Sequence, residues 1–454
     1  MTDQAQPSVL KLMQSRAYRG WVLTLFLLVA MFGFIDRQII SALGQPIKHD
    51  LGLSDAQLGF LGGLVFALLN AALTIPIARI AERKRRVTII TIGIFLWSIA
   101  TCLCGAALGF FQLVLARLSV GVGEATSSPA TASLIADYFP RDRRTSASAV
   151  LVLAVPLGAL IGAAGGGFIA QHYNWRLAFV IAGAPGVILG VLMALTIREP
   201  IRGHYDAPTA GGETAPPFSA VLRRMVARPA FLHVMLGSTI ASMGGFGINY
   251  FLAPYFFRSF GLDYAQGGLL SGLISAIPGS ISMLGGGLLA DYLGRRDPRF
   301  YAWVPGIGAL IAAPLYMLSF IQHGWPAATA VLMLTGLFQY AYLPASAGVS
   351  ANIMEPRMRA SAAAIVGIMT NLIGAGLAPL LVGALSDHFA KTSFTGDFHA
   401  ACAGPLAAET ASAGACGQAS ATGLQHAFIV FAAVYLWAAF HFWLAGRTIK
   451  RDMA

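Results

Sequence analysis

Long apolar runs separated by short polar segments are the feature that most limits how this chain can fold. Twelve such runs begin near Trp21, Leu58, Val87, Gln112, Thr145, Leu177, Ala230, Ala265, Phe300, Pro326, Met358 and Gln425. A helix that spans a bilayer needs about 20 predominantly apolar residues. Only 11% of the residues are charged, whereas soluble domains carry about 25%, so a water-soluble enzyme and a disordered chain are both excluded. We therefore expect an all-α membrane protein with twelve transmembrane helices.

The basic residues indicate how these helices cross the membrane. An even number of spans puts both termini on one side, and the segments on that side carry most of the 30 Lys and Arg residues. The opposite segments hold Lys48, Arg176, Arg258 and Lys391. Because cytoplasmic loops are enriched in Lys and Arg, we expect cytoplasmic termini and a location in the cell (inner) membrane. The net charge of +11 then reflects topology and contact with anionic membrane lipids, and no nucleic-acid partner is needed.

The second half of the sequence resembles the first. Asp36 aligns with Asn249 and Glu124 with Gln339, at the similar offsets of 213 and 215 residues. Each half holds six predicted helices, an even number, so both halves enter the membrane in the same orientation as parallel repeats. The predicted parts are a cytoplasmic tail 1–20, an N-terminal six-helix bundle 21–197, a cytoplasmic linker 198–229, a C-terminal six-helix bundle 230–446 with an outer loop 387–424, and a cytoplasmic tail 447–454.

Four charged side chains fall inside the predicted helices of the first half: Asp36, Arg37, Arg117 and Glu124. A charge at the bilayer centre costs roughly 2.5 to 3.5 kcal/mol, so such residues are functional candidates. A rise of 1.5 Å per residue puts Asp36 level with Arg117, and Glu124 two turns further along the same helix face. One interpretation is structural, with two ion pairs that fix the first helix against the fourth. In the other, Asp36 and Glu124 bind the coupling proton, while Arg37 and Arg117 set the carboxylate pKa values and bind a substrate anion.

Polar side chains of the second half could form the other wall of a central cavity. The further substrate-binding candidates are Asn249, Tyr250, Gln339, Tyr340 and Asn371. They lie among phenylalanines, and aromatic residues at this density are also typical of packing or of lipid-facing surfaces. If these side chains line the cavity, one wall is charged and the other is apolar with hydroxyl groups. That combination suits an amphipathic substrate.

Several short motifs are similar to those of a known family. Residues 287–296 (GLLADYLGRR) and 117–125 (RLSVGVGEA) resemble signatures of the major facilitator superfamily, and residues 82–86 (ERKRR) keep the charged run of the first signature without its glycines. Asp36-Arg37 together with residues 117–125 looks like the Spinster branch, whose members are sphingolipid or lysolipid transporter-like. The resemblance implies the facilitator fold of two six-helix bundles.

The resemblance also implies a gate on the cytoplasmic side. In this family, charged loop segments form salt bridges between the two halves, which assigns gating roles to Glu82, Arg83, Arg143, Asp291 and Arg295. Anchoring by positive charge on the cytoplasmic side explains part of the same pattern. Residues 158–167 (GALIGAAGGG) resemble the antiporter signature of the family, which favours export, although close helix packing explains such spacing equally well.

Cys402 and Cys416 lie in the predicted outer loop, on the oxidising side of the membrane. A disulfide between them would close a loop of about 15 residues and stabilise the protein by around 3 kcal/mol in the chain-entropy model. The sequence leaves open whether the two cysteines are bridged.

Other functional classes are excluded by missing motifs. No lysine follows a glycine, as an ATP-driven pump would require, and the histidines show no metal-ligand spacing. A lipid-modifying enzyme would need a nucleophile with a base or a metal cluster. We therefore expect a monomer without catalytic residues, metal or cofactor, apart from the proton as coupling ion. The predicted function is proton-coupled secondary active transport of an amphipathic or anionic lipid-like substrate by alternating access, with export as the expected direction. The alternative is a proton symporter for uptake of a small organic anion.

Overall fold

The computed structural model describes residues 15–202, 217–355, 358–402 and 413–453, and all of its regular elements in these ranges are helical. Eleven helices there are long and apolar enough to cross a membrane. The fourth predicted span is not among them, and it consists of the two shorter helices α7 (Phe110–Glu124) and α8 (Ser127–Tyr138). Between these two helices, the Thr126 hydroxyl donates a hydrogen bond to the carbonyl of Gly123.

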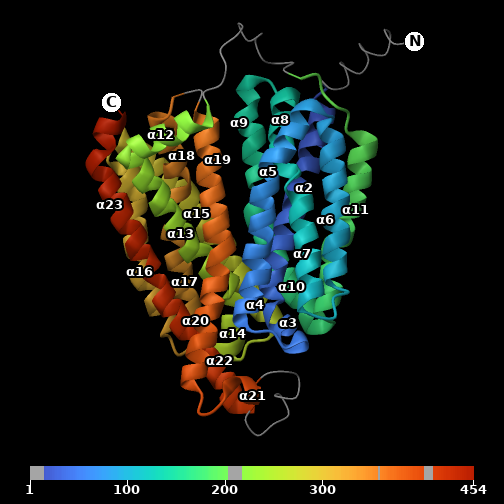
Figure 1. Ribbon diagram of the computed structural model, residues 1–454, viewed down its shortest axis with the longest axis vertical. Helices are drawn as coiled ribbons and strands as arrows, with labels where there is room; N and C mark the ends of the chain where they lie inside the picture. The colour runs from blue at the N-terminus through green and yellow to red at the C-terminus, as the bar shows by residue number, and fades with distance from the viewer. Residues whose placement is uncertain (1–14, 203–216, 356–357, 403–412, 454) are drawn as a thin grey trace.

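The first half of the chain forms one group of helices (Figure 1). Besides α7 and α8, these are α2 (Arg16–Ala42), α3 (Gly44–Leu51), α4 (Asp55–Gly59), the π-helix η1 (Phe60–Leu64), α5 (Val65–Arg83), α6 (Arg86–Cys104), α9 (Arg141–Val152), α10 (Ala154–His172) and α11 (Trp175–Thr196). The start of α2 lies at the upper end of Figure 1, which we call the terminal end. Helices α3 and α4 lie at the opposite end, the far end.

The second half forms a second group beside the first (Figure 1). It consists of α13 (Pro229–Tyr250), α14 (Leu252–Phe260), α15 (Tyr264–Gly294), α16 (Phe300–Phe320), α17 (Trp325–Gln339), α18 (Tyr342–Ile353), α19 (Arg359–Met369), the π-helix η2 (Thr370–Leu377), α20 (Ala378–Ser393), α21 (Phe398–Cys402), α22 (Ala413–Ala432) and α23 (Val434–Met453). Helix α23 ends at the terminal end, where α2 begins.

Helices extend into three of the segments that were predicted as loop, tail or linker. Residues 387–393 and 413–424 of the expected outer loop belong to α20 and α22. Residues 413–424 contain several Ala residues, which are good helix formers even where the hydropathy is low. Most of the predicted tail 447–454 continues α23, whose Asp452 accepts a 2.8 Å hydrogen bond from the backbone N–H of Ala230. The predicted linker contains α12 (Phe218–Ala227), while its residues 203–216 and tail residues 1–14 lie outside the described ranges.

Close packing of α10 on α2 fixes the position of the charged segment of α2. A Cβ atom on Gly158 would lie 2.5 Å from Cβ of Phe34, and one on Gly162 would lie 2.8 Å from the carbonyl oxygen of Ile35. Both distances are shorter than a side chain could tolerate without a shift of the helices. These glycines therefore hold the backbone next to Asp36 in place.

Candidate functional site

Asp36 and Arg117 form a buried ion pair between α2 and α7. Arg117 Nη1 donates to Asp36 Oδ2 at 2.8 Å, and the Thr101 hydroxyl of α6 donates to Asp36 Oδ1 at 2.6 Å. Asp36 is 5% exposed and Arg117 is 1% exposed. Both oxygens of this carboxylate are therefore engaged, and the pair is enclosed by protein.

Arg37 and Glu124 form a second pair between the same two helices. Arg37 Nη2 and Nε lie 2.5 and 2.7 Å from Glu124 Oε2. The Glu124 side chain is 2% exposed, whereas that of Arg37 is 38% exposed. The guanidinium carbon also lies 4.6 Å from the ring centre of Phe66. Glu124 Oε1 is buried and has no hydrogen-bond partner, so this carboxylate is only half engaged.

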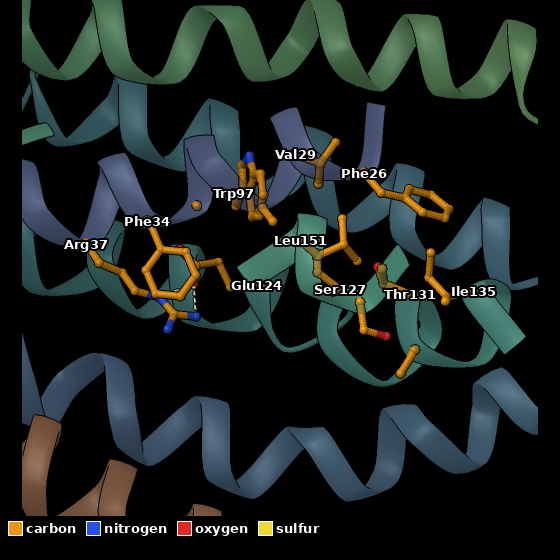
Figure 2. A pocket seen from close by; sticks show the side chains of 14 residues that line it. Phe26, Val29, Phe34, Arg37, Trp97, Glu124, Ser127, Thr131, Ile135 and Leu151 are labelled. Carbon is orange, nitrogen blue, oxygen red and sulfur yellow. Dashed lines mark hydrogen bonds and ion pairs between the residues drawn. The ribbon is translucent and has the colours of Figure 1, made fainter. Parts of the chain in front are cut away.

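The second pair borders a cavity of about 410 Å³ inside the first half, between α2, α6, α7, α8 and α9. Figure 2 shows the side chains around it, with dashed lines between Arg37 and Glu124. Its polar lining residues are Arg37, Glu124, Ser127, Thr131 and Ser148, and its larger apolar ones are Phe26, Val29, Phe34, Trp97, Ile135 and Leu151. The space is amphipathic, with an ion pair at one side and hydroxyl and apolar groups beyond it.

The structure brings the four predicted charges together as two ion pairs, the arrangement of the structural interpretation. Only the second pair borders the cavity, because Asp36 and Arg117 are not among its lining residues. Burying an ion pair costs desolvation free energy that its Coulomb attraction only partly returns, so the pairs are weak evidence for stability. The geometry is therefore compatible with the functional interpretation. The Asp36 carboxylate is enclosed by protein, whereas Glu124 is one of the residues that line the cavity.

Three of the predicted second-half residues form a polar cluster between α13 and α17. The Ser275 hydroxyl donates to Asn249 Oδ1 at 3.1 Å, and Asn249 Nδ2 donates to the Tyr340 hydroxyl at 3.4 Å. The Tyr316 hydroxyl donates to Gln339 Oε1, while Gln339 Nε2 is buried without a partner. These residues do not line the cavity of the first half.

The other two second-half candidates have different surroundings. The Tyr250 hydroxyl donates to the carbonyl of Leu58 at 2.8 Å, and the Ser41 hydroxyl donates to the carbonyl of Tyr250 at 2.5 Å, so Tyr250 joins the two halves. Asn371 is exposed, and its Nδ2 donates to the carbonyl of Gly367 on the same helical segment. The structure does not gather all five second-half candidates into one site.

The predicted gating charges lie at the terminal end. Arg83, Arg143, Asp291 and Arg295 are exposed, and the side chain of Glu82 lies outside what the structure describes. The predicted latch between Asp291 and Arg143 stays a prediction.

A charged network at the far end was missed by the sequence reasoning. Arg258 of α14 makes two hydrogen bonds to the Asp55 carboxylate, at 2.6 and 2.7 Å, across the boundary between the halves. Lys48 and the Ser386 hydroxyl bond to the same carboxylate at 2.7 and 2.6 Å. Burial lowers the pKa of Lys48, and the neighbouring Asp55 charge opposes this shift. One sequence feature could have indicated this network: Lys48 and Arg258 are two of the few basic residues in the predicted segments on the membrane side opposite the termini.

Asp387 of the second half caps a helix of the first. Its Oδ1 and Oδ2 accept hydrogen bonds from the backbone N–H groups of Asp55 and Ala56, at 3.0 and 2.9 Å. A carboxylate at this position also interacts favourably with the positive N-terminus of α4. We call Lys48, Asp55, Arg258, Ser386 and Asp387 the far-end network.

Polar contacts that join the halves lie at the far end in the described ranges. They comprise the far-end network, the Tyr250 bonds, the 2.8 Å bond from Arg258 Nε to Gln45 and the 3.1 Å bond from the backbone N–H of Tyr264 to Gln171. In Figure 1 the two groups of helices approach each other at the lower, far end and diverge toward the terminal end. The polar links between the halves are therefore concentrated at the far end, and close packing of α10 on α15 at Gly167, Gly268 and Gly272 joins the halves as well.

Cys402 and Cys416 are joined by a disulfide, with their Cα atoms 5.6 Å apart. The bond ties α21 to the start of α22 at the far end. No group of three or more His, Cys, Asp or Glu residues in the described ranges is arranged to hold a metal ion.

Comparisons with known proteins show which family this chain belongs to and which solved structures share its fold. A family model described as Major Facilitator Superfamily matches residues 25–320. The "MFS-type efflux pump" of Mycolicibacterium smegmatis is 32% identical over 438 residues, which are 96% of this chain and 94% of that protein. The "Sphingosine-1-phosphate transporter SPNS2" of Danio rerio is 23% identical over 387 residues, which are 81% of this chain and 76% of that protein. A crystal structure of a bacterial homolog to the human lysosomal transporter Spinster, in an inward-facing and unoccupied conformation, is 32% identical, has a TM-score of 0.85 and covers 96% of this chain and 99% of its own.

Proposed function

Because the chain belongs to the Major Facilitator Superfamily and resembles its Spinster branch, we propose that it exports an amphipathic or anionic lipid-like substrate by proton-coupled alternating access. Membership of this family makes it a multi-pass membrane transporter and not an enzyme. We further propose that it lies in the cell (inner) membrane as a monomer with cytoplasmic termini. In this proposal the proton is the coupling ion, with no other cofactor and no nucleic-acid partner.

The observation that carries the proposal is the Arg37–Glu124 pair at the edge of an amphipathic cavity. A buried carboxylate is desolvated, which favours its protonated form, while the adjacent guanidinium favours the charged form. Protonation of Glu124 would weaken its bond to Arg37. The released guanidinium could then bind an anionic headgroup, because guanidinium pairs well with phosphate and carboxylate.

Asp36 is the second proton-binding candidate in this mechanism. Its carboxylate is held by both Arg117 and Thr101, so a proton would compete with the Arg117 charge for this group. Glu124 offers an oxygen without a partner. We therefore place the coupling step at Glu124 first, with Asp36 and Arg117 setting the electrostatic surroundings.

The far-end network supports alternating access. With the halves joined at the far end, the substrate path would open toward the terminal end, which is the inward-facing state if the termini are cytoplasmic. The similarity to a Spinster homolog solved in an inward-facing conformation supports this assignment. Export would then require the far-end network to break and the predicted terminal-end latch, Arg143 with Asp291, to close.

Substrate class and direction are supported by the cavity and by the relatives. The lining joins an ion pair to large apolar side chains, which suits an amphipathic molecule. The named activities of two relatives, efflux and sphingosine-1-phosphate transport, favour export and a lipid-like substrate.

A transport assay with purified protein in proteoliposomes tests the proposal. A panel of lysophospholipids and small organic anions would be offered with and without an imposed pH gradient. We expect gradient-dependent movement of a lysophospholipid and no dependence on ATP. Gradient-driven accumulation of a small organic anion alone would instead favour the uptake symporter. A transport rate that does not change when the pH gradient is imposed would contradict proton coupling.

A further inference from the structure

Helix α12, in the predicted linker, has a continuous apolar face that the protein covers only in part. At 3.6 residues per turn this face is an arc of roughly 140°, formed by Phe218, Val221, Leu222, Met225 and Val226. Val221 and Met225 are buried in the hydrophobic core, and α12 contacts α13 and α19 of the second half. Phe218, Leu222 and Val226 are 59%, 41% and 65% exposed. One stripe of large apolar side chains, which we call the exposed stripe, is therefore left uncovered.

The exposed stripe lies close to the point where the chain enters the membrane. Only Arg228 separates the end of α12 at Ala227 from the start of the apolar span α13 at Pro229. The backbone of Arg228 is extended, so α12 and α13 are two separate helices. Figure 1 shows α12 at the terminal end of the second group of helices. Because the membrane span begins next to α12, we place the exposed stripe at the level of the lipid headgroups.

Arginine side chains flank the apolar arc on both sides. Arg223 lies next to the exposed stripe on the helix surface and is itself exposed, whereas Arg224 lies next to the buried side of the arc. Arg224 Nη2 is 3.8 Å from Glu355 Oε1, which ties α12 to the second half. Residues 217–228 include three arginines and no acid. An apolar helix face flanked by cations is typical of helices that lie in the membrane interface and attract anionic lipids.

We propose that the exposed stripe of α12 lies in the headgroup region of the membrane and that Arg223 binds the phosphate of an anionic phospholipid. Since Val221, Met225 and the Arg224–Glu355 pair hold α12 on the second half, the bound lipid anchors this half at the terminal end. The inference goes beyond the proposed function, because it holds whichever substrate and coupling ion the transporter uses.

Photocrosslinking of the purified full-length protein tests this placement. The photoprobe p-benzoylphenylalanine, which inserts into nearby C–H bonds, replaces Leu222 in the middle of the exposed stripe. The nanodiscs contain equal amounts of phosphatidylglycerol and phosphatidylcholine with the same acyl chains, and mass spectrometry measures the lipid adducts. A basic residue near the surface favours an anionic lipid by about fivefold, so we expect at least about fivefold more adducts with phosphatidylglycerol than with phosphatidylcholine.

Variants of Arg223 separate the effect of charge from that of the apolar contact. Arg223→Gln removes the cation beside the exposed stripe and should lower the adduct ratio by about two- to fivefold, whereas Arg223→Lys keeps the charge and should keep most of the ratio. Arg16→Gln is the matched control, because Arg16 is exposed at the start of α2 in the first half. It should leave the ratio unchanged. The same photoprobe in place of Ala227, on the opposite side of α12 from the apolar arc, should give few lipid adducts.

An absence of lipid adducts at position 222, or equal yields at positions 222 and 227, would overturn the inference. A preference for phosphatidylglycerol that Arg223→Gln leaves unchanged would do the same. Crosslinks from position 222 to a second copy of this chain would assign the exposed stripe to a protein contact and would also overturn it.

Discussion

At the scale of single residues, the two acids of α2 and α7 differ in how their oxygens are used. Asp36 has a partner on each oxygen, Arg117 and Thr101, whereas Glu124 has Arg37 on one oxygen and none on the other. The first carboxylate is therefore held in place, and the second can exchange partners. This difference favours Glu124 over Asp36 as the proposed site of proton coupling.

Replacing Arg117 by Ala should destabilise the protein strongly. The change leaves the Asp36 charge buried without its cationic partner, which typically costs about 3 to 5 kcal/mol. Arg37→Ala should cost less, because the Arg37 side chain is partly exposed. Thermal unfolding of the purified variants in the same detergent checks this order. A smaller loss for Arg117→Ala than for Arg37→Ala would contradict it.

Sequence reasoning reached the four charged residues and one of their two pairings. Helix rise alone placed Asp36 level with Arg117, and the structure confirms that these two residues meet. The choice of partner for Glu124 depends on the rotation of α2 about its axis. That rotation is set by contacts such as Gly158 against Phe34, which apolar periodicity does not reveal.

At the scale of helices, the packing of α10 against α2 fixes the position of the segment of α2 that carries Asp36 and Arg37. Gly158→Ala should destabilise by about 1 to 3 kcal/mol and reduce transport, because the new Cβ would overlap Phe34 and Met31 and push α2 away from α10. Gly165 of the same helix has no atom within 4 Å of an added Cβ, so Gly165→Ala is the matched control and should be tolerated. Similar unfolding temperatures for the two variants would refute this role of the packing.

Twelve membrane-spanning segments could be predicted from apolar runs, and the family comparisons confirm the facilitator fold. The helical structure of residues 413–424 could not be predicted in this way, because their many Ala, Gly and Ser residues are less hydrophobic than those of a typical membrane span. The cap that Asp387 places on α4 was also beyond prediction. It joins residues more than 300 positions apart, and no local pattern specifies it.

At the scale of the whole molecule, the far-end network should control which end opens. Asp387→Asn removes one of two acceptors for the N-terminus of α4 and its negative charge, so the outward-open population should rise by roughly fivefold, for a loss of about 1 kcal/mol. Distances between spin labels at the far end of each half measure this ratio. Asp263→Asn is the control, because Asp263 caps α15 within its own half. An equal shift in both variants would argue against a gate.

The predicted latch at the terminal end should act in the opposite sense. Asp291→Asn should lower the outward-facing population, because that state would lose a charge-assisted bond between the halves, expected to involve Arg143. Spin labels at the terminal end report this change. If the ratio of the two states stays as in the wild-type protein, Asp291 has no latch function.

The measurement that tests the central claim most directly is gradient-driven transport by Glu124→Gln in proteoliposomes. The amide is close in size to the carboxylic acid but cannot release a proton, so coupling should be lost while exchange of a lysophospholipid across the membrane persists at least in part. Asp36→Asn is assayed beside it, and Ser119→Ala, which removes an exposed hydroxyl of α7 outside the cavity lining, serves as the unaffected control. We predict that the wild-type protein moves the lysophospholipid against its concentration gradient when only a pH gradient is supplied, and that Glu124→Gln does not. Accumulation by both carboxylate variants at the wild-type level would contradict proton coupling at this site and leave the two ion pairs with a structural role alone.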